Sequence, residues 1–127
     1  MSKLGNYWRG RVAVLALASA AALPAAADIV IGQVAPLSGV LATTGQQMVL
    51  GGKLYFDSVN ASGGIHGQKI KVLVQDDAYK VDDTVRLTKA LLANPEVVAL
   101  YGFAGTANVG QLLTDGVPEE GGAAFVA

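Results

Sequence analysis

The chain has 127 residues, a formal net charge of −1 and no cysteine. The length favours a single domain, and the lack of cysteine excludes disulfides, thiol catalysis and cysteine-ligated metals. Three of the nine basic residues lie in the first 27 positions and all ten acidic residues lie after them, so residues 28–127 carry a net charge of −4. Because no basic cluster offsets that charge, the composition argues against nucleic acid as a partner.

The N-terminal 27 residues have the order of a secretory signal peptide. A basic start precedes an apolar, alanine-rich stretch over residues 12–23, and three consecutive alanines follow at residues 25–27. Small residues in that place are typical of a signal-peptidase site. The apolar stretch is shorter than the roughly 20 residues that a membrane span needs, which favours a signal peptide over a retained anchor. We expect cleavage between Ala27 and Asp28.

The first predicted strand covers residues 29–34, a nearly continuous run of apolar and β-branched residues. Such a run is typical of a strand buried on both faces in a parallel sheet. Pro36 and Gly39 break the strand, because proline cannot donate to a sheet and glycine allows a sharp turn. From about Gly45 to Asn60, apolar residues recur every three or four positions, which predicts an amphipathic helix. Its expected buried face comprises Met48, Val49, Gly52, Tyr55, Phe56 and Val59.

A glycine-rich turn, residues 60–68, leads into a second predicted strand at residues 70–75. Three glycines in nine residues mark the segment as a connection rather than a regular element. The turn contains His66, the only histidine of the chain. We interpret His66 as a solvated turn residue, since a catalytic or metal-binding role would need partner groups that are missing nearby.

Two adjacent carboxylates, Asp76 and Asp77, follow the second predicted strand. Paired carboxylates can serve acid–base catalysis or bind a cation. No further oxygen ligand follows at the spacing of a calcium-binding loop. We therefore favour the interpretation that both are the solvated end of a strand.

The rest of the chain repeats the plan of a strand followed by a helix. The pattern predicts a helix over residues 81–94 and a third strand at residues 97–101. A weaker helix, which Pro118 should kink or divide, extends to about Glu120, and residues 123–127 form a fourth strand. This alternation predicts right-handed βαβ units and a parallel sheet covered on both faces. The predicted fold class is α/β, a partial doubly wound, Rossmann-like sheet of the form βαβαβα(β).

Ligands of open α/β sheets bind at the carboxyl ends of the strands. One loop expected there, residues 102–108, contains two glycines that allow the backbone close to a ligand. Thr106 supplies a hydroxyl where the next helix begins, beside backbone N–H groups that lack partners inside the helix. This pattern fits a carboxylate-binding site. It fits equally well a threonine that only caps the helix, and the residues alone leave both interpretations open.

Several common enzyme motifs are incomplete in this sequence. The segment Gly51-Gly52-Lys53 departs from a P-loop, which requires an earlier glycine and a following serine or threonine. Gly102 and Gly105 lack the spacing of a dinucleotide-binding fingerprint, and no serine is framed as G-x-S-x-G. We expect a protein that is not an enzyme and that uses no cofactor or metal.

Several short motifs follow the leader in a characteristic order. They are Val34-Ala35-Pro36-Leu37-Ser38-Gly39, Gly45, the segment VNASGGIHGQKI at residues 59–70, Asp76-Asp77, and Tyr101-Gly102-Phe103-Ala104-Gly105-Thr106. Together they resemble the start of the type I periplasmic binding proteins of the leucine/isoleucine/valine-binding kind. These proteins are the extracytoplasmic receptors of branched-chain amino-acid ABC transporters. Relatives that bind amides, urea or aromatic acids share the motifs, so the resemblance indicates the family better than the ligand.

The resemblance implies two lobes that close over a small ligand. It implies that Thr106 holds the carboxylate of the ligand, helped by backbone groups of Gly105 and Ala107. The first loop would form part of the cleft wall, with Ser38 and Thr44 as ligand contacts. Several amino-acid binders carry an aromatic residue at the position of Thr44, so this chain departs from the family there.

The resemblance also implies a partner and a compartment. The receptor would bind an amino acid or a related carboxylate or amide in the periplasm and deliver it to an ABC permease in the inner membrane. Family members are several hundred residues long, so we expect residues 28–127 to be an incomplete N-terminal lobe, as in a fragment or a truncated product. Two alternatives stay open: a ligand-sensing regulator of the same fold, and an exported α/β enzyme whose catalytic residues lie outside this sequence.

Overall fold

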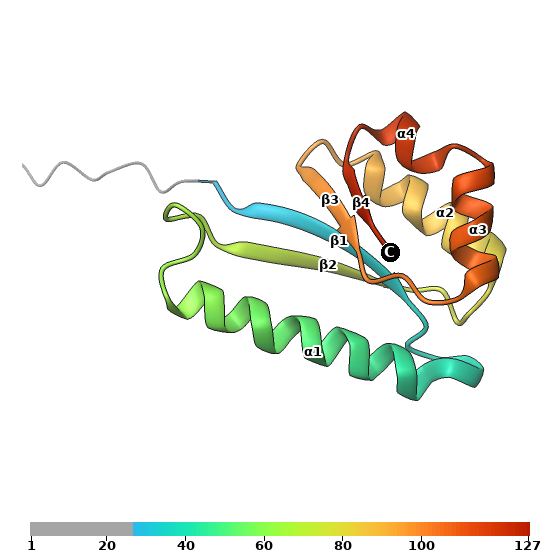
Figure 1. Cartoon of the computed structure of the whole chain (residues 1–127), viewed down its shortest axis with the longest axis horizontal. Helices are drawn as coiled ribbons and strands as arrows, with labels where there is room; N and C mark the ends of the chain where they lie inside the picture. The colour runs from blue at the N-terminus through green and yellow to red at the C-terminus, as the bar shows by residue number, and fades with distance from the viewer. Residues whose placement is uncertain (1–26) are drawn as a thin grey trace, which may run out of the picture.

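The computed structural model describes residues 27–127, which form a four-stranded parallel sheet flanked by helices (Figure 1). The strands are β1 (Ile29–Ala35), β2 (Ile70–Asp76), β3 (Val97–Tyr101) and β4 (Ala124–Val126). The helices are the 3₁₀ turn η1 (Gly39–Leu41), α1 (Ala42–Ala61), α2 (Val81–Leu92), α3 (Thr106–Thr114) and α4 (Val117–Gly121). The predicted α/β fold with a parallel sheet is confirmed. Apart from Ala27, the expected signal peptide lies outside the described residues.

Strand β1 is the centre of the sheet, whose strand order is β2-β1-β3-β4. It pairs with β2 over its whole length, from Ile29 opposite Ile70 to Ala35 opposite Asp76, and with β3 on its other side. All of its residues after Ile29 are buried, as expected for an apolar strand with neighbours on both sides. Because every pair is parallel, the carboxyl ends of β1, β2 and β3 lie at the same edge of the sheet.

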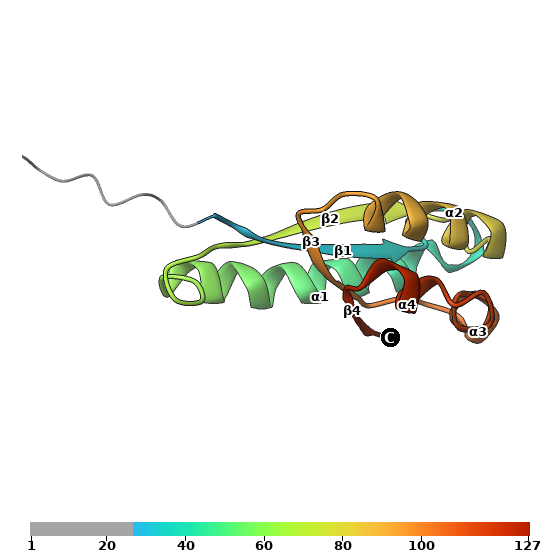
Figure 2. The same cartoon turned by 90° about the horizontal axis from the view of Figure 1, so that it is seen from above.

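The two faces of the sheet are covered unequally. Helix α1 lies along one face beside β1 and β2, while α2, α3 and α4 pack together on the other side (Figures 1 and 2). Each of these three helices contributes to one buried apolar cluster that also contains strand and loop residues. The cluster comprises Val30, Val34, Leu91, Val97, Leu100, Phe103, Leu112 and Val117. No helix among residues 27–127 has the length and apolar character needed to cross a bilayer.

Helix α1 begins three residues earlier than predicted and is preceded by η1. The prediction that Tyr55 is buried is wrong, because Tyr55 is 67% exposed. Phe56, the other aromatic residue of the predicted face, does face the sheet, with its ring centroid 5.3 Å from that of Tyr101 in an edge-on arrangement. Tyr55 contacts this pair from outside, 5.8 Å from the Phe56 ring.

The predicted weak helix after β3 is divided, as expected, into α3 and α4. The break lies before the proline, at Gly116, whose φ of 65° is left-handed and ends α3. Pro118 then occupies the first turn of α4, where its missing N–H breaks no helical bond.

The glycine-rich connection from α1 to β2 is fixed by the side chain of Asn60. Its Nδ2 donates to the carbonyl of Ile70 at 2.8 Å, and its Oδ1 accepts from the amide of Ile70 at 2.7 Å. Gly64 has a φ of +76°, and a Cβ there would lie 2.0 Å from the carbonyl oxygen of Gln68. This part of the motif therefore sets the start of β2, and His66 is exposed within the turn.

Candidate functional site

Three loops meet at the carboxyl edge of the sheet, after β1, β2 and β3 (Figure 1). The carboxylate of Asp76 joins the first loop to the second. One of its oxygens accepts hydrogen bonds from the amides of Leu37 at 2.8 Å, Ser38 at 3.2 Å and Ala78 at 2.9 Å. The pKa of Asp76 is lowered, mainly by the Ser38 hydroxyl and next by the hydrogen bond from the Ala78 amide. The backbone of Ser38 is thus held by Asp76.

Asp77 differs from its neighbour in burial, and the prediction that both carboxylates are solvated is wrong for it. Asp77 is 1% exposed, while Asp76 is exposed. The carboxylate of Asp77 accepts from the hydroxyl of Thr84 at 2.5 Å and from the amide of Tyr79 at 2.9 Å. Thr84 belongs to the first turn of α2, so packing of that helix against the strand end removes Asp77 from water. Within the part of the chain that the structure describes, no three acidic or histidine side chains cluster to hold a metal.

The loop after β2 holds two consecutive non-glycine residues in the left-handed region. Ala78 has a φ of 48° and Tyr79 a φ of 63°, a conformation that costs free energy for residues with a Cβ. The amides of the two residues are held by the carboxylates of Asp76 and Asp77, respectively. Strained loops of this kind are frequent at ligand sites. Tyr79 was missed by sequence reasoning, because nothing in the local pattern distinguishes it from an ordinary loop residue.

Tyr79 lies directly against Gly105 of the third loop. A Cβ on Gly105 would be 2.6 Å from Cε2 of Tyr79 and 2.7 Å from Oδ1 of Asn108. The φ of Gly105 is +97°, which a residue with a side chain rarely adopts. The glycine is therefore required both by its backbone and by the tyrosine ring that occupies the space beside it.

Thr106 does not cap α3, so the capping interpretation is wrong. The N-cap position belongs to Gly105, Thr106 is the first helical residue, and no side-chain hydrogen bond caps the helix. The side chain of Thr106 is exposed. Among residues 27–127, no hydrogen-bond acceptor is found for the backbone amides of Thr106, Ala107 and Asn108. Within the described part of the chain, the start of α3 therefore presents three N–H groups and one hydroxyl that make no hydrogen bond.

The other predicted ligand contacts, Ser38 and Thr44, are not joined directly to Thr106. Thr44 lies in the first turn of α1 and is exposed. Within residues 27–127, no hydrogen bond joins Ser38 or Thr44 to Thr106, and the hollow beside Thr106 is lined by neither Ser38 nor Thr44. The assignment of Ser38, Thr44, Gly105, Thr106 and Ala107 as ligand contacts stays a prediction.

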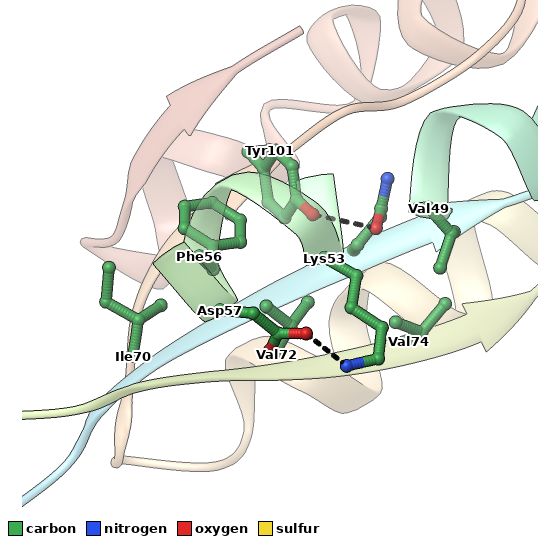
Figure 3. Close-up of a pocket in the computed structure, with 9 residues that line it drawn as sticks. Val49, Lys53, Phe56, Asp57, Ile70, Val72, Val74 and Tyr101 are labelled. Carbon is green, nitrogen blue, oxygen red and sulfur yellow. Dashed lines mark hydrogen bonds and ion pairs between the residues drawn. The ribbon is translucent and has the colours of Figure 1, made fainter. Parts of the chain in front are cut away.

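Two hollows in the surface can be compared by their distance from the carboxyl edge of the sheet. A shallow hollow of about 450 Å³ is lined by Gly105, Thr106, Val109, Gly110, Leu113 and Ala127. A second cavity of about 220 Å³ lies between α1 and the sheet (Figure 3), with Gln33 and Tyr101 at one side and the Lys53–Asp57 ion pair at the other. Only the first includes residues of the loops at the carboxyl edge.

Comparisons with known proteins agree on one family. A model of the periplasmic binding protein family matches residues 28–118. An amino acid binding protein from Pseudomonas aeruginosa is 35% identical over 104 residues, which cover 80% of this chain and 27% of that protein.

Solved structures give the same result. A substrate-binding periplasmic protein from Ralstonia solanacearum matches with a TM-score of 0.75 and 40% identity, over 77% of this chain and 28% of that one. The branched-chain amino acid transporter substrate binding protein LivJ from Streptococcus pneumoniae, in complex with isoleucine, matches with a TM-score of 0.70 and 28% identity, also over 77% of this chain and 28% of that one. The chain thus spans about a quarter of the length of these relatives. It belongs to the periplasmic binding protein family.

Proposed function

We propose that residues 28–127 are part of the N-terminal lobe of a two-lobed ABC-transporter substrate-binding protein. Its ligand is a branched-chain amino acid or a related small carboxylate or amide. The protein binds its ligand without chemical change, closes over it and delivers it to a permease in the inner membrane. The names of the relatives from Pseudomonas aeruginosa and Streptococcus pneumoniae support the amino-acid class.

The observation that carries this proposal is the uncapped start of α3. Three amides that have no acceptor within residues 27–127 lie in the first turn, and the positive end of the helix dipole favours an anion there. The hydroxyl of Thr106 adds a fourth donor with no partner among the described residues. A carboxylate has two oxygens and about four acceptor positions, so one carboxylate of an amino acid can use all four donors.

The other site residues have supporting roles in this proposal. Gly105 and Ala107 act through their backbone, and Ser38 and Thr44 line the cleft on the side of the first loop. Asp76 connects Ser38 to the second loop through two hydrogen bonds from the backbone of the first loop. The Asp76 carboxylate therefore holds this wall of the cleft in place in the absence of a ligand.

We further propose that residues 1–27 direct export to the periplasm and are then removed. Ala27 and Asp28 are exposed and precede β1, so cleavage between them leaves the sheet intact. N-terminal sequencing of the protein recovered from the periplasm should start at Asp28. Recovery there with Met1 still present would contradict the proposed cleavage.

The ligand proposal is tested by nuclear magnetic resonance on the ¹⁵N-labelled chain. Isoleucine should shift the amide signals of Thr106, Ala107 and Asn108 as its concentration rises. The matched control is 2-methylbutylamine, which has the same side chain and amino group but no carboxylate. It should leave these three signals in place. Equal shifts with both compounds, or no shift at the start of α3 with isoleucine, would overturn the proposed site.

A further inference from the structure

We propose that Asp77, Thr84 and Asn108 form a buried positioning network that holds Tyr79 against Gly105 and thereby sets the direction of the first-turn amides of α3. The inference rests on the proposed function for its purpose, since those amides are the proposed carboxylate site. The network itself is a property of the ligand-free chain and can be tested without a ligand.

The geometry of the network is continuous. The Thr84 hydroxyl donates to Oδ2 of Asp77 at 2.5 Å and accepts from Nδ2 of Asn108 at 2.7 Å. The other oxygen of Asp77 accepts from the amide of Tyr79 at 2.9 Å. Asp77 and Asn108 are 1% exposed and Thr84 is 0% exposed. One hydroxyl group therefore connects the loop after β2 to the first turn of α3.

Both ends of the network reach the proposed site. Asp77 fixes the amide of Tyr79, a residue that is held at a φ of 63°. Asn108 is the third residue of α3, and its Oδ1 would lie 2.7 Å from a Cβ on Gly105. The Tyr79 ring would lie 2.6 Å from that same Cβ. Gly105 is thus enclosed by two groups, each of which the network holds in place.

The composition of the network also indicates a role beyond packing. Buried polar groups must be paired to avoid a desolvation penalty, and apolar residues of similar volume often stabilise a core as well or better. Here three polar side chains from a loop and two helices satisfy one another, and no buried side-chain nitrogen or oxygen of the described residues is left without a partner. Fully satisfied networks restrict their members to one arrangement, which suits a site whose donors must converge on one anion.

Thr88 provides a matched control for Thr84. Both threonines are 0% exposed and lie one turn apart on α2. Each hydroxyl lies within hydrogen-bond distance of the carbonyl four residues earlier, Lys80 at 3.0 Å for Thr84 and Thr84 at 2.7 Å for Thr88. Only Thr84 also contacts Asp77 and Asn108. Thr84→Val and Thr88→Val therefore both remove a buried hydroxyl, and only the first interrupts the network.

The first experiment is carried out on the full chain without ligand. The ring current of Tyr79 should displace the Hα signals of Gly105, and a nuclear Overhauser effect should connect the two residues. Thr84→Val should abolish both signatures, whereas Thr88→Val and the hydroxyl-retaining variant Thr84→Ser should keep them. If Thr84→Val does not fold, Asn108→Ala is used, which leaves the Asp77–Thr84 bond intact and should still release Gly105. Retention of both signatures in the folded Thr84→Val or Asn108→Ala variant would overturn the proposal.

The second experiment adds isoleucine and follows the amides of Thr106 and Ala107. Thr84→Val should weaken the apparent affinity about tenfold, as expected when buried polar neighbours are coupled. Thr88→Val and Thr84→Ser should bind like the unsubstituted chain. Equal weakening by both valine variants would mean that only general stability matters and would overturn the positioning role. Absence of any shift in the unsubstituted chain would overturn the proposed function, and the ligand-free signatures would still decide the network.

Discussion

The phenol of Tyr101 donates a hydrogen bond to Oε1 of Gln33 at 3.0 Å, and this bond connects β3 to the centre of β1 on the face covered by α1. Gln33 is 0% exposed, and its Nε2 donates to the carbonyl of Gly102 at 3.3 Å. Burial raises the pKa of Tyr101. The pair therefore fixes the strand end from which the third loop departs.

Replacing Tyr101 by phenylalanine should lower the free energy of unfolding by about 1–2 kcal/mol, because the buried Oε1 of Gln33 loses its donor. Chemical denaturation of the two proteins measures the difference. The control is Tyr55→Phe on α1, where the side chain is exposed and makes no hydrogen bond among the described residues, so no change is expected. Equal effects of the two substitutions would contradict the role of the Gln33 bond.

Gly45 is required by the close approach of α1 to the first loop. A Cβ at this position would lie 2.0 Å from the carbonyl oxygen of Pro36, a backbone atom that cannot rotate away. Gly45→Ala should therefore destabilise the chain by about 1–3 kcal/mol, as overpacking does. A Cβ on Gly51 of the same helix would have none of the described atoms within 4 Å. Gly51→Ala should therefore stabilise the chain by up to about 1 kcal/mol, because alanine has the higher helix propensity. Thermal unfolding of both variants tests the pair, and a stabilised Gly45→Ala protein would contradict the packing.

The sheet and most of the helices could be predicted from the sequence because their signals are local. The apolar run of β1 and the short apolar run of β3 identify buried strands without reference to any other segment. The strand boundaries of β3 agree with the prediction, and β1 extends by one residue to Ala35. The apolar spacing of α1 likewise predicts a helix. It does not predict which of the two adjacent rings, Tyr55 or Phe56, packs against Tyr101, because that depends on how the helix is rotated about its axis.

The site was harder to predict, because its properties depend on segments far apart in the sequence. The burial of Asp77 results from Thr84 and Asn108, which belong to two later helices. The position of Tyr79 depends on a left-handed backbone, which a glycine would have indicated but which alanine and tyrosine do not. Thr106 could be identified as a helix-start hydroxyl, whereas its inability to cap follows from a one-residue shift of the N-cap to Gly105.

The bonds to Asp76 should make stability depend on pH in the acidic range. They lower the pKa of this carboxylate below its usual value of 3.8, so the folded state binds its proton more weakly than the unfolded state does. The contribution is present above the unfolded pKa and is lost as the pH falls through the folded pKa. Asp76→Asn should therefore lower the free energy of unfolding more at pH 6 than at pH 3. Asp28→Asn, at an exposed position before β1, is the control, and a deficit of Asp76→Asn that is equal at both pH values would contradict this account.

Ala78→Gly should stabilise the chain, because glycine adopts a φ of 48° without the steric cost that alanine bears. The gain should be up to about 1 kcal/mol, since the greater freedom of glycine in the unfolded chain offsets part of the relief. Ala90→Gly in the last turn of α2 is the control and should destabilise the chain by up to about 1 kcal/mol. Denaturant titration compares the two, and loss of stability in both would show that the loop after β2 is not strained at Ala78.

Thr106→Val tests the proposed carboxylate site most directly. Valine has nearly the same shape as threonine and lacks the hydroxyl, and Thr106 is exposed and makes no capping bond, so stability should change little. Hydrogen bonds to a charged group contribute about 1.5–3 kcal/mol, and each 1.4 kcal/mol corresponds to about a tenfold change in affinity. The affinity for isoleucine, measured by the amide shifts at the start of α3, should fall by about one to two orders of magnitude.

Binding should weaken rather than vanish in this variant, because the amides of Thr106, Ala107 and Asn108 still face the anion. Thr114→Val at the other end of α3 is the matched control. It removes a hydroxyl that donates to the carbonyl of Gly110 at 2.8 Å, and it should leave the affinity unchanged. Equal affinities for Thr106→Val and the unsubstituted chain would assign the anion site to the backbone alone. A loss of affinity in Thr114→Val of the same size would instead trace the effect to the stability of α3, since that hydroxyl lies at the opposite end of the helix from the proposed carboxylate.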